Sequence, residues 1–132
     1  MLDTNICVSL IRRRPEPLIQ RIDRTPVGDI GISVVSLAEL EYGVSKSTQP
    51  RRNREALQQF ISPLEVAPFD RPATAAYGRI RAFLERKGQL IGSMDLMIAA
   101  HAVSLGVPLI TSNLDEFRRV PGLRVNDWAG AR

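Results

Sequence analysis

The order of apolar and polar positions along the chain predicts short strands that alternate with helices. Three apolar stretches have the length and β-branched composition of buried strands, at 29–36, 64–69 and 107–113. The last is almost wholly apolar, as expected where both faces of a sheet are covered. The apolar pair at 1–2 is interpreted as the end of another short strand, and 123–128 as an edge strand.

The segments between these strands carry helical spacing. Leu37, Leu40 and Val44 recur at intervals of three and four residues behind Ser36, which predicts a helix from Ser36. The N-cap preference of serine similarly predicts that Ser93 caps a later helix. The predicted helices span 6–11, 18–24, 36–43, 49–62, 71–88 and 93–106.

Strands separated by helices predict an α/β fold, a three-layer sandwich around a central, mostly parallel sheet. No repeat or linker divides the chain, so one domain over residues 1–132 is expected. In parallel sheets of this kind, ligands bind beyond the carboxyl ends of the strands. The residues that follow each predicted strand are therefore the first candidates for a functional site.

Composition and charge narrow the class of protein. Lysine and arginine number 18 against 14 acidic residues, and arginine binds phosphate oxygens through a planar fork, which weakly favours a nucleic-acid partner. No apolar stretch is long enough to span a membrane, and no signal peptide is recognisable. A single cysteine, Cys7, allows no intrachain disulfide, so a reducing, cytoplasmic location is expected.

The chain holds one histidine and one cysteine, which excludes a two-histidine acid–base pair and a usual structural zinc site. His101 lies about 240° around its predicted helix from Asp95, so it cannot form a catalytic relay with Asp95 and Ser93. No glycine-rich phosphate loop is present. Any catalysis must therefore rely on carboxylates, hydroxyls, amides and arginines.

Four predicted strand-to-helix junctions carry acidic or amide side chains. Asp3 follows the first strand, Glu39 lies in the first turn of the next long helix, and Asp95 lies in the first turn of a later one. A parallel sheet gathers such junctions at one edge, where clustered carboxylates repel each other unless a cation neutralises them. A hard divalent cation such as Mg²⁺ suits oxygen ligands of this kind. The fourth junction offers three candidates: Asn113, Asp115 and Glu116.

Each acid taken alone also has a purely structural interpretation. Asp3 fits a helix N-cap, and Asp95 fits an acidic residue beside a helix N-terminus. Ser36 and Glu39 have the spacing of a capping box. Only the fold can decide between capping and a shared site.

Five segments, in order and from end to end of the chain, resemble the PIN-domain family and, within it, the VapC-type toxins of bacterial toxin–antitoxin operons. The resemblance implies an endoribonuclease that depends on Mg²⁺ or Mn²⁺ and hydrolyses RNA phosphodiesters, possible targets being tRNA or rRNA loops. Hydrolysis of this type leaves a 5′-phosphate and a 3′-hydroxyl. The segments are MLDTNI, SVVSLAELEYG, GSMDLMIAAHA, LITSNLDEF and GLRVNDW.

Carried over by motif position, the resemblance implies that Asp3 and Asp95 bind the metal ion and that Glu39 and Glu116 complete the acidic pocket. Asn113 occupies a position that many relatives fill with an acid, so the choice among Asn113, Asp115 and Glu116 for the fourth position stays open at this point. The side chains implied to orient the carboxylates or water are Asn5, Thr111 and Asn113.

The resemblance also implies a small VapB-type antitoxin as partner, a homodimer, and contact with operator DNA only through the antitoxin. Two alternatives remain: a non-catalytic PIN-like binding module, and a phosphatase resembling the haloacid dehalogenases. The phosphatase would need a second aspartate where Asn5 stands. Eight arginines are candidates for RNA contact, although each is individually more typical of a solvated helix face: Arg12, Arg13, Arg14, Arg51, Arg52, Arg54, Arg118 and Arg119.

Overall fold

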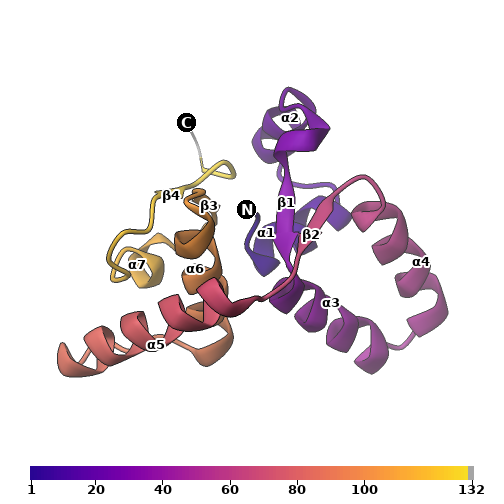
Figure 1. Ribbon diagram of the computed structural model, residues 1–132. Coiled ribbons are helices and arrows are strands. Elements are labelled where there is room, and N and C mark those ends of the chain that lie inside the picture. The colour runs from indigo at the N-terminus through magenta and orange to yellow at the C-terminus, as the bar shows by residue number, and fades with distance from the viewer. Residues whose placement is uncertain (131–132) are drawn as a thin grey trace.

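The computed structural model describes residues 1–130, and Figure 1 shows the arrangement of its elements. The helices are α1 (Thr4–Ile11), α2 (Glu16–Asp23), α3 (Val34–Lys46), α4 (Pro50–Ile61), α5 (Arg71–Arg86), α6 (Ser93–Leu105) and α7 (Leu114–Phe117), with a 3₁₀ turn at Val27–Asp29. The strands are β1 (Gly31–Ser33), β2 (Glu65–Ala67), β3 (Leu109–Ile110) and β4 (Val125–Asn126).

A short parallel sheet forms the middle layer. Strand β1 pairs with β2 and strand β3 pairs with β4, in both cases parallel. Leu2 joins the two pairs, because it bridges to Ile32 on one side and to Ile110 on the other. The N–H of Asp3 donates to the carbonyl of Ile110 at 2.9 Å. The sheet order is therefore β2, β1, the Leu2 segment, β3, β4, with every carboxyl end at the same edge.

Helices cover both faces of this sheet, which confirms the predicted three-layer α/β fold. Helices α5, α6 and α7 lie on one side of the sheet, and α1, α3 and α4 lie on the other (Figure 1). The buried apolar residues fall into two clusters accordingly. Leu109 belongs to the first and Ile110 to the second, because successive strand residues point to opposite faces.

Helix α3 begins earlier than the sequence predicts. It starts at Val34 because the side chain of Ser33 accepts the N–H of Val35 at 3.0 Å. Ser36 is buried inside the helix and is not its N-cap. The capping-box interpretation of Glu39 is therefore wrong.

The other helix ends show one more correction. Ser93 does not cap α6: Gly92 is the N-cap residue, and no side chain bonds to the first turn. Gly106 ends α6 as expected, in the left-handed conformation with φ of 68°. Asp70 caps α5 by accepting the N–H of Ala73 at 3.3 Å, which confirms the predicted start of that helix.

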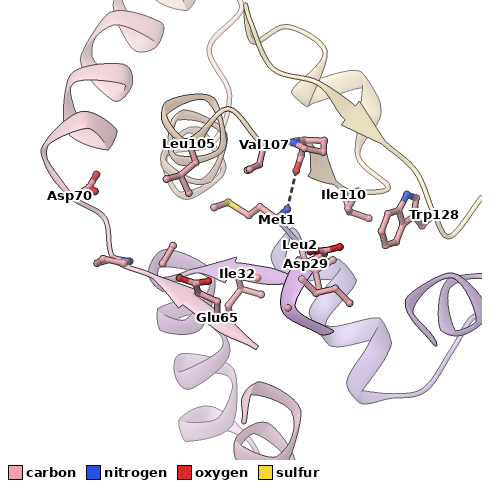
Figure 2. A pocket seen from close by; sticks show the side chains of 16 residues that line it. Met1, Leu2, Asp29, Ile32, Glu65, Asp70, Leu105, Val107, Ile110 and Trp128 are labelled. Atoms are coloured by element: carbon pink, nitrogen blue, oxygen red, sulfur yellow. Dashed lines mark hydrogen bonds between the residues drawn. The ribbon is translucent and has the colours of Figure 1, made fainter. Parts of the chain in front are cut away.

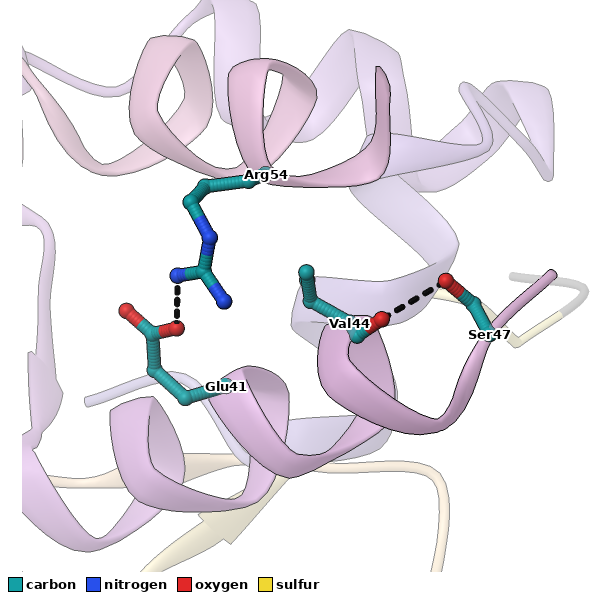
Figure 3. Close-up of polar contacts among 4 residues, drawn as sticks. All are labelled: Glu41, Val44, Ser47 and Arg54. Atoms are coloured by element: carbon teal, nitrogen blue, oxygen red, sulfur yellow. Dashed lines mark hydrogen bonds and ion pairs between the residues drawn. The ribbon is translucent and has the colours of Figure 1, made fainter. Parts of the chain in front are cut away.

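Polar contacts fix the corner between α3 and α4 (Figure 3). The hydroxyl of Ser47 donates to the carbonyl of Val44 at 2.7 Å and ends α3. Arg54 on α4 forms an ion pair with Glu41 on α3. Both side chains are more than a third exposed, so solvent screens this pair and it adds little stability. The buried Leu57 supplies the apolar contact that holds α4 in place.

The central position of Leu2 generates a stability prediction. Leu2 is 2% exposed, so Leu2→Ala should lower the free energy of unfolding by about 2–5 kcal/mol. Leu105 is 48% exposed, so the matched change Leu105→Ala should cost less than about 1 kcal/mol. Urea denaturation of both variants measures the difference. Equal losses would contradict the central place of Leu2 in the sheet.

Candidate active site

Four acidic side chains from four separate segments lie at the carboxyl edge of the sheet. Asp3 directly follows Leu2, and Glu39 lies in the second turn of α3. Asp95 lies in the first turn of α6, and Glu116 lies in α7, which follows β3. The parallel arrangement brings these segments together, because each helix begins where its preceding strand or loop reaches this edge.

The carboxylate of Asp3 is buried and held by two hydrogen bonds. Its Oδ1 accepts the N–H of Thr4 at 2.7 Å, and its Oδ2 accepts the hydroxyl of Thr111 at 2.8 Å. Burial raises the pKa of Asp3, the two hydrogen bonds oppose this shift, and the charges of Glu39 and Glu116 add to it. Asp3 therefore caps α1 and also lies within reach of the charges of the other acids, so its capping role does not exclude a role in a shared site.

Glu39 is tied to Asp3 through Thr4. The Thr4 hydroxyl donates to Glu39 Oε1 at 2.5 Å, and the same Oγ1 lies 3.1 Å from Ser36 Oγ. A hydroxyl has only one proton, so Thr4 can donate to only one of these two oxygens at a time. The sequence pattern does not predict a role at the site for either Thr4 or Ser36. The available signals were the position of Thr4 next to Asp3 and the three-residue spacing of Ser36 and Glu39.

A second contact between acids of the cluster joins Asp95 to Glu116. Burial, together with a hydrogen bond that the protonated Asp95 donates to Glu116 and the charges of Glu116, Asp3 and Glu39, raises the pKa of Asp95 to about 7. At neutral pH Asp95 is therefore protonated for part of the time. Glu116 Oε1 is buried without a hydrogen-bond partner among the described residues.

The loop that carries Glu116 places its three candidate side chains differently. Asn113 Nδ2 donates to Glu116 Oε2 at 3.3 Å, and the N–H of Asn113 donates to Thr111 Oγ1 at 3.0 Å. Asp115 is exposed and lines a different depression, beside the end of α5. The geometry therefore favours Glu116 over Asp115 as the fourth acid, with Asn113 as its hydrogen-bond partner.

The remaining chemical candidates lie outside this cluster. Asn5 is exposed, and no hydrogen bond recorded among the described residues joins it to the acids. His101 is fully buried, and its Nδ1 lies 2.7 Å from Ser33 Oγ rather than near Asp95. Cys7 is buried in the apolar cluster that contains Leu2.

The acid cluster has the chemistry of a site for a hard cation. Residues 1–130 contain no group of three acidic, histidine or cysteine side chains already spaced to hold a metal ion. The buried carboxylate of Asp3, the raised pKa of Asp95 and the unpartnered oxygen of Glu116 nevertheless mark negative charge that the protein itself leaves uncompensated. A divalent cation bound by oxygen atoms would compensate it.

A large cavity lies elsewhere. It has a volume of about 540 Å³ and lies beside Met1, with residues that precede β1 and β3 among its lining (Figure 2). Asp29 and Trp128 also line it, but none of the four clustered acids does. Cavity size therefore does not identify the candidate active site in this fold. Within residues 1–130, no helix has both the length and the apolar character needed to cross a membrane.

Comparison with known proteins identifies the family. Residues 1–123 match the model of the PIN domain. The chain is 45% identical to the tRNA(fMet)-specific endonuclease VapC of Salmonella typhimurium over 128 residues, which cover 97% of this chain and 96% of that protein. It is 43% identical to ribonuclease VapC2 of Rickettsia felis over 129 residues, with the same two coverages of 97% and 96%.

Solved structures agree with this relationship. The DNA-bound VapBC of Salmonella typhimurium superposes with a TM-score of 0.93 at 45% identity, over 97% of this chain and 96% of that chain. VapBC2 of Rickettsia felis, bound to a DNA fragment from its promoter, gives a TM-score of 0.91 at 42% identity, over 97% of each chain. This fold excludes the haloacid-dehalogenase-like alternative. The chain belongs to the PIN-domain family and, within it, to the VapC ribonucleases.

Proposed function

We propose that this protein is a divalent-metal-dependent endoribonuclease and the toxin of a type II toxin–antitoxin pair. The observation that carries the proposal is the convergence of four carboxylates at one sheet edge, with burial and mutual contact raising the pKa of Asp95 to about 7. The naming of its relatives as VapC endonucleases and ribonucleases supports the same activity. A non-catalytic binding module would have no need to retain four mutually repelling acids.

In this proposal Asp3 and Asp95 hold Mg²⁺ or Mn²⁺, and Glu39 and Glu116 complete the negative pocket. A bound ion of this type lowers the pKa of water and offsets charge on the phosphate. The chain itself fixes the carboxylates: Thr4 and Thr111 orient Asp3, and Thr4 also orients Glu39. Attack of water on the phosphodiester would yield RNA fragments that end in a 5′-phosphate and a 3′-hydroxyl.

The proposed substrate is RNA, with tRNA loops as the first class to test because the Salmonella relative is named as specific for tRNA(fMet). An antitoxin of the VapB type is the proposed partner, since the two structural neighbours described above are VapBC complexes that hold DNA. Contact with operator DNA would come through that antitoxin. The proposed place of action is the cytoplasm, where these RNAs lie, and a homodimer stays a prediction.

The metal site generates the first prediction. Purified protein should cleave tRNA with Mg²⁺ or Mn²⁺, and Asp95→Asn should lower kcat by about two orders of magnitude or more because a metal ligand is lost. Mn²⁺ should also raise the melting temperature of the wild type but not that of Asp95→Asn. Cleavage that persists in excess EDTA would contradict metal dependence.

A second prediction separates Glu39 from a structural role. Glu39→Gln removes the charge but keeps a hydrogen-bond acceptor for Thr4, so cleavage should fall strongly while the melting temperature stays equal or rises. Glu41→Gln, on the same helix but paired with Arg54 away from the cluster, is the matched control and should cleave normally. Full activity of Glu39→Gln would show that Glu39 is not part of the acid pocket.

A third prediction concerns the adjacent acids of α7. Glu116→Gln should damage cleavage far more than Asp115→Asn, because only Glu116 faces the cluster. Asn113→Asp should be tolerated or should strengthen Mn²⁺ binding, since a carboxylate binds a hard cation better than an amide does. Cleavage rates at matched thermal stability decide the order, and a dead Asp115→Asn enzyme beside a live Glu116→Gln enzyme would reverse it.

A further inference from the structure

Two depressions follow one another along α5 and share Phe83 and Pro121. The first has a volume of about 460 Å³ and lies between the end of α5 and the residues that follow α7. The second, of about 410 Å³, lies between α5, Val103 of α6 and the turn at Pro121. Together they form one surface, here called the α5 groove, whose charged lining residues are Arg79, Arg86, Lys87, Asp115, Arg118 and Arg119.

The α5 groove is strongly basic. Five cationic side chains line it against one carboxylate, that of Asp115, whereas the whole chain has 18 basic and 14 acidic residues. All five cationic side chains are exposed. Among residues 1–130 the ion pairs join Arg54 to Glu41 and Arg81 to Glu85, so the cations of the groove are not neutralised in this way.

One face of α5 carries cations of the groove, and another face carries an ion pair in which positive and negative charge cancel. Arg79, Phe83 and Arg86 are spaced by four and three residues and therefore share one helix face. Arg81 and Glu85 lie on another face and pair with each other at 3.1 Å. Apart from Arg71 in the first turn, the cations of α5 that lack an acidic partner therefore line the groove.

The groove and the acid cluster lie on two sides of the same short helix. Glu116 of α7 meets Asp95 in the acid cluster, whereas its neighbour Asp115 lines the groove together with Arg118. A helix is only about 10 Å across with its side chains. A polyanion whose reacting phosphate lies at the acids can therefore cross α7 and continue into the groove.

We propose that the α5 groove binds the phosphate backbone of the RNA substrate beside the cleavage site. This inference rests on the proposed function, because it takes RNA as the substrate. Arginine forks bind phosphate oxygens in pairs, and the half-buried ring of Phe83, with Lys87 Nζ 5.5 Å from its centre, gives the groove an apolar floor. Such contacts recognise the backbone without reading sequence, so the groove supplies affinity and register while the acids supply the chemistry.

The test is binding of fluorescently labelled bulk tRNA to the full chain in EDTA, where cleavage is prevented. Arg86→Gln/Arg118→Gln should raise Kd about tenfold at 100 mM salt and should reduce the slope of log K against log salt concentration by about 1 for each side chain removed. Arg24→Gln/Arg71→Gln, at two exposed positions outside the groove, is the control of equal charge and should change Kd less than about threefold.

Under cleavage conditions with Mn²⁺, the groove variant should show a raised KM and an unchanged kcat, because its arginines do not touch the reacting atoms. Unchanged tRNA binding by the groove variant, or an equal loss in the Arg24→Gln/Arg71→Gln control, would overturn the proposal. A groove variant that binds tRNA normally but loses an acidic protein partner would overturn it too, in favour of that partner. Wild-type protein that binds tRNA through the groove but never cleaves it would refute the proposed function alone.

Discussion

The buried carboxylate of Asp3 is the constraint on which the rest of the candidate site depends. Burying a charge is costly unless hydrogen bonds compensate it, and two of them do so here, from Thr4 and Thr111. The compensation is incomplete, because burial still raises the pKa of Asp3. The two donors come from α1 and from the residue after β3, so the carboxylate proposed to bind the cation also fastens two elements at the centre of the sheet.

Thr4 extends this network to the opposite wall of the site. Its N–H bonds to Asp3 and its hydroxyl bonds to Glu39, which lies 35 positions further along the chain. Asp95 and Glu116 approach from the other side, and the charges of Glu116 and Asp3 raise the pKa of Asp95. The acids therefore behave as one electrostatic unit. A polyanion would be repelled by this unit unless a cation sat within it and positive side chains stood nearby, as those of the α5 groove do.

Hydrophobic spacing was sufficient to predict the layers of the fold and the edge at which the acids gather, because parallel strands separated by helices leave few other arrangements. It could not predict the start of α3, where Ser33 and Ser36 are both good caps and the fold lets Ser33 accept the N–H of Val35. It left open whether Asp115 or Glu116 points to the acid cluster, because the orientation of a four-residue helix depends on its tertiary contacts. The α5 groove could not be predicted, since Lys87 and Arg119, which line one depression, are 32 positions apart and only the fold brings them together.

The four clustered acids are proposed to form one metal site, and crystals soaked in Mn²⁺ test this most directly. Anomalous diffraction should show a single strong peak in contact with the carboxylates of Asp3 and Asp95, beside Glu39 and Glu116. The same peak should be absent from crystals of Asp95→Asn. A peak in the cavity beside Met1 and Asp29, or no peak near Asp3 in well-diffracting crystals, would contradict a metal site at the four acids.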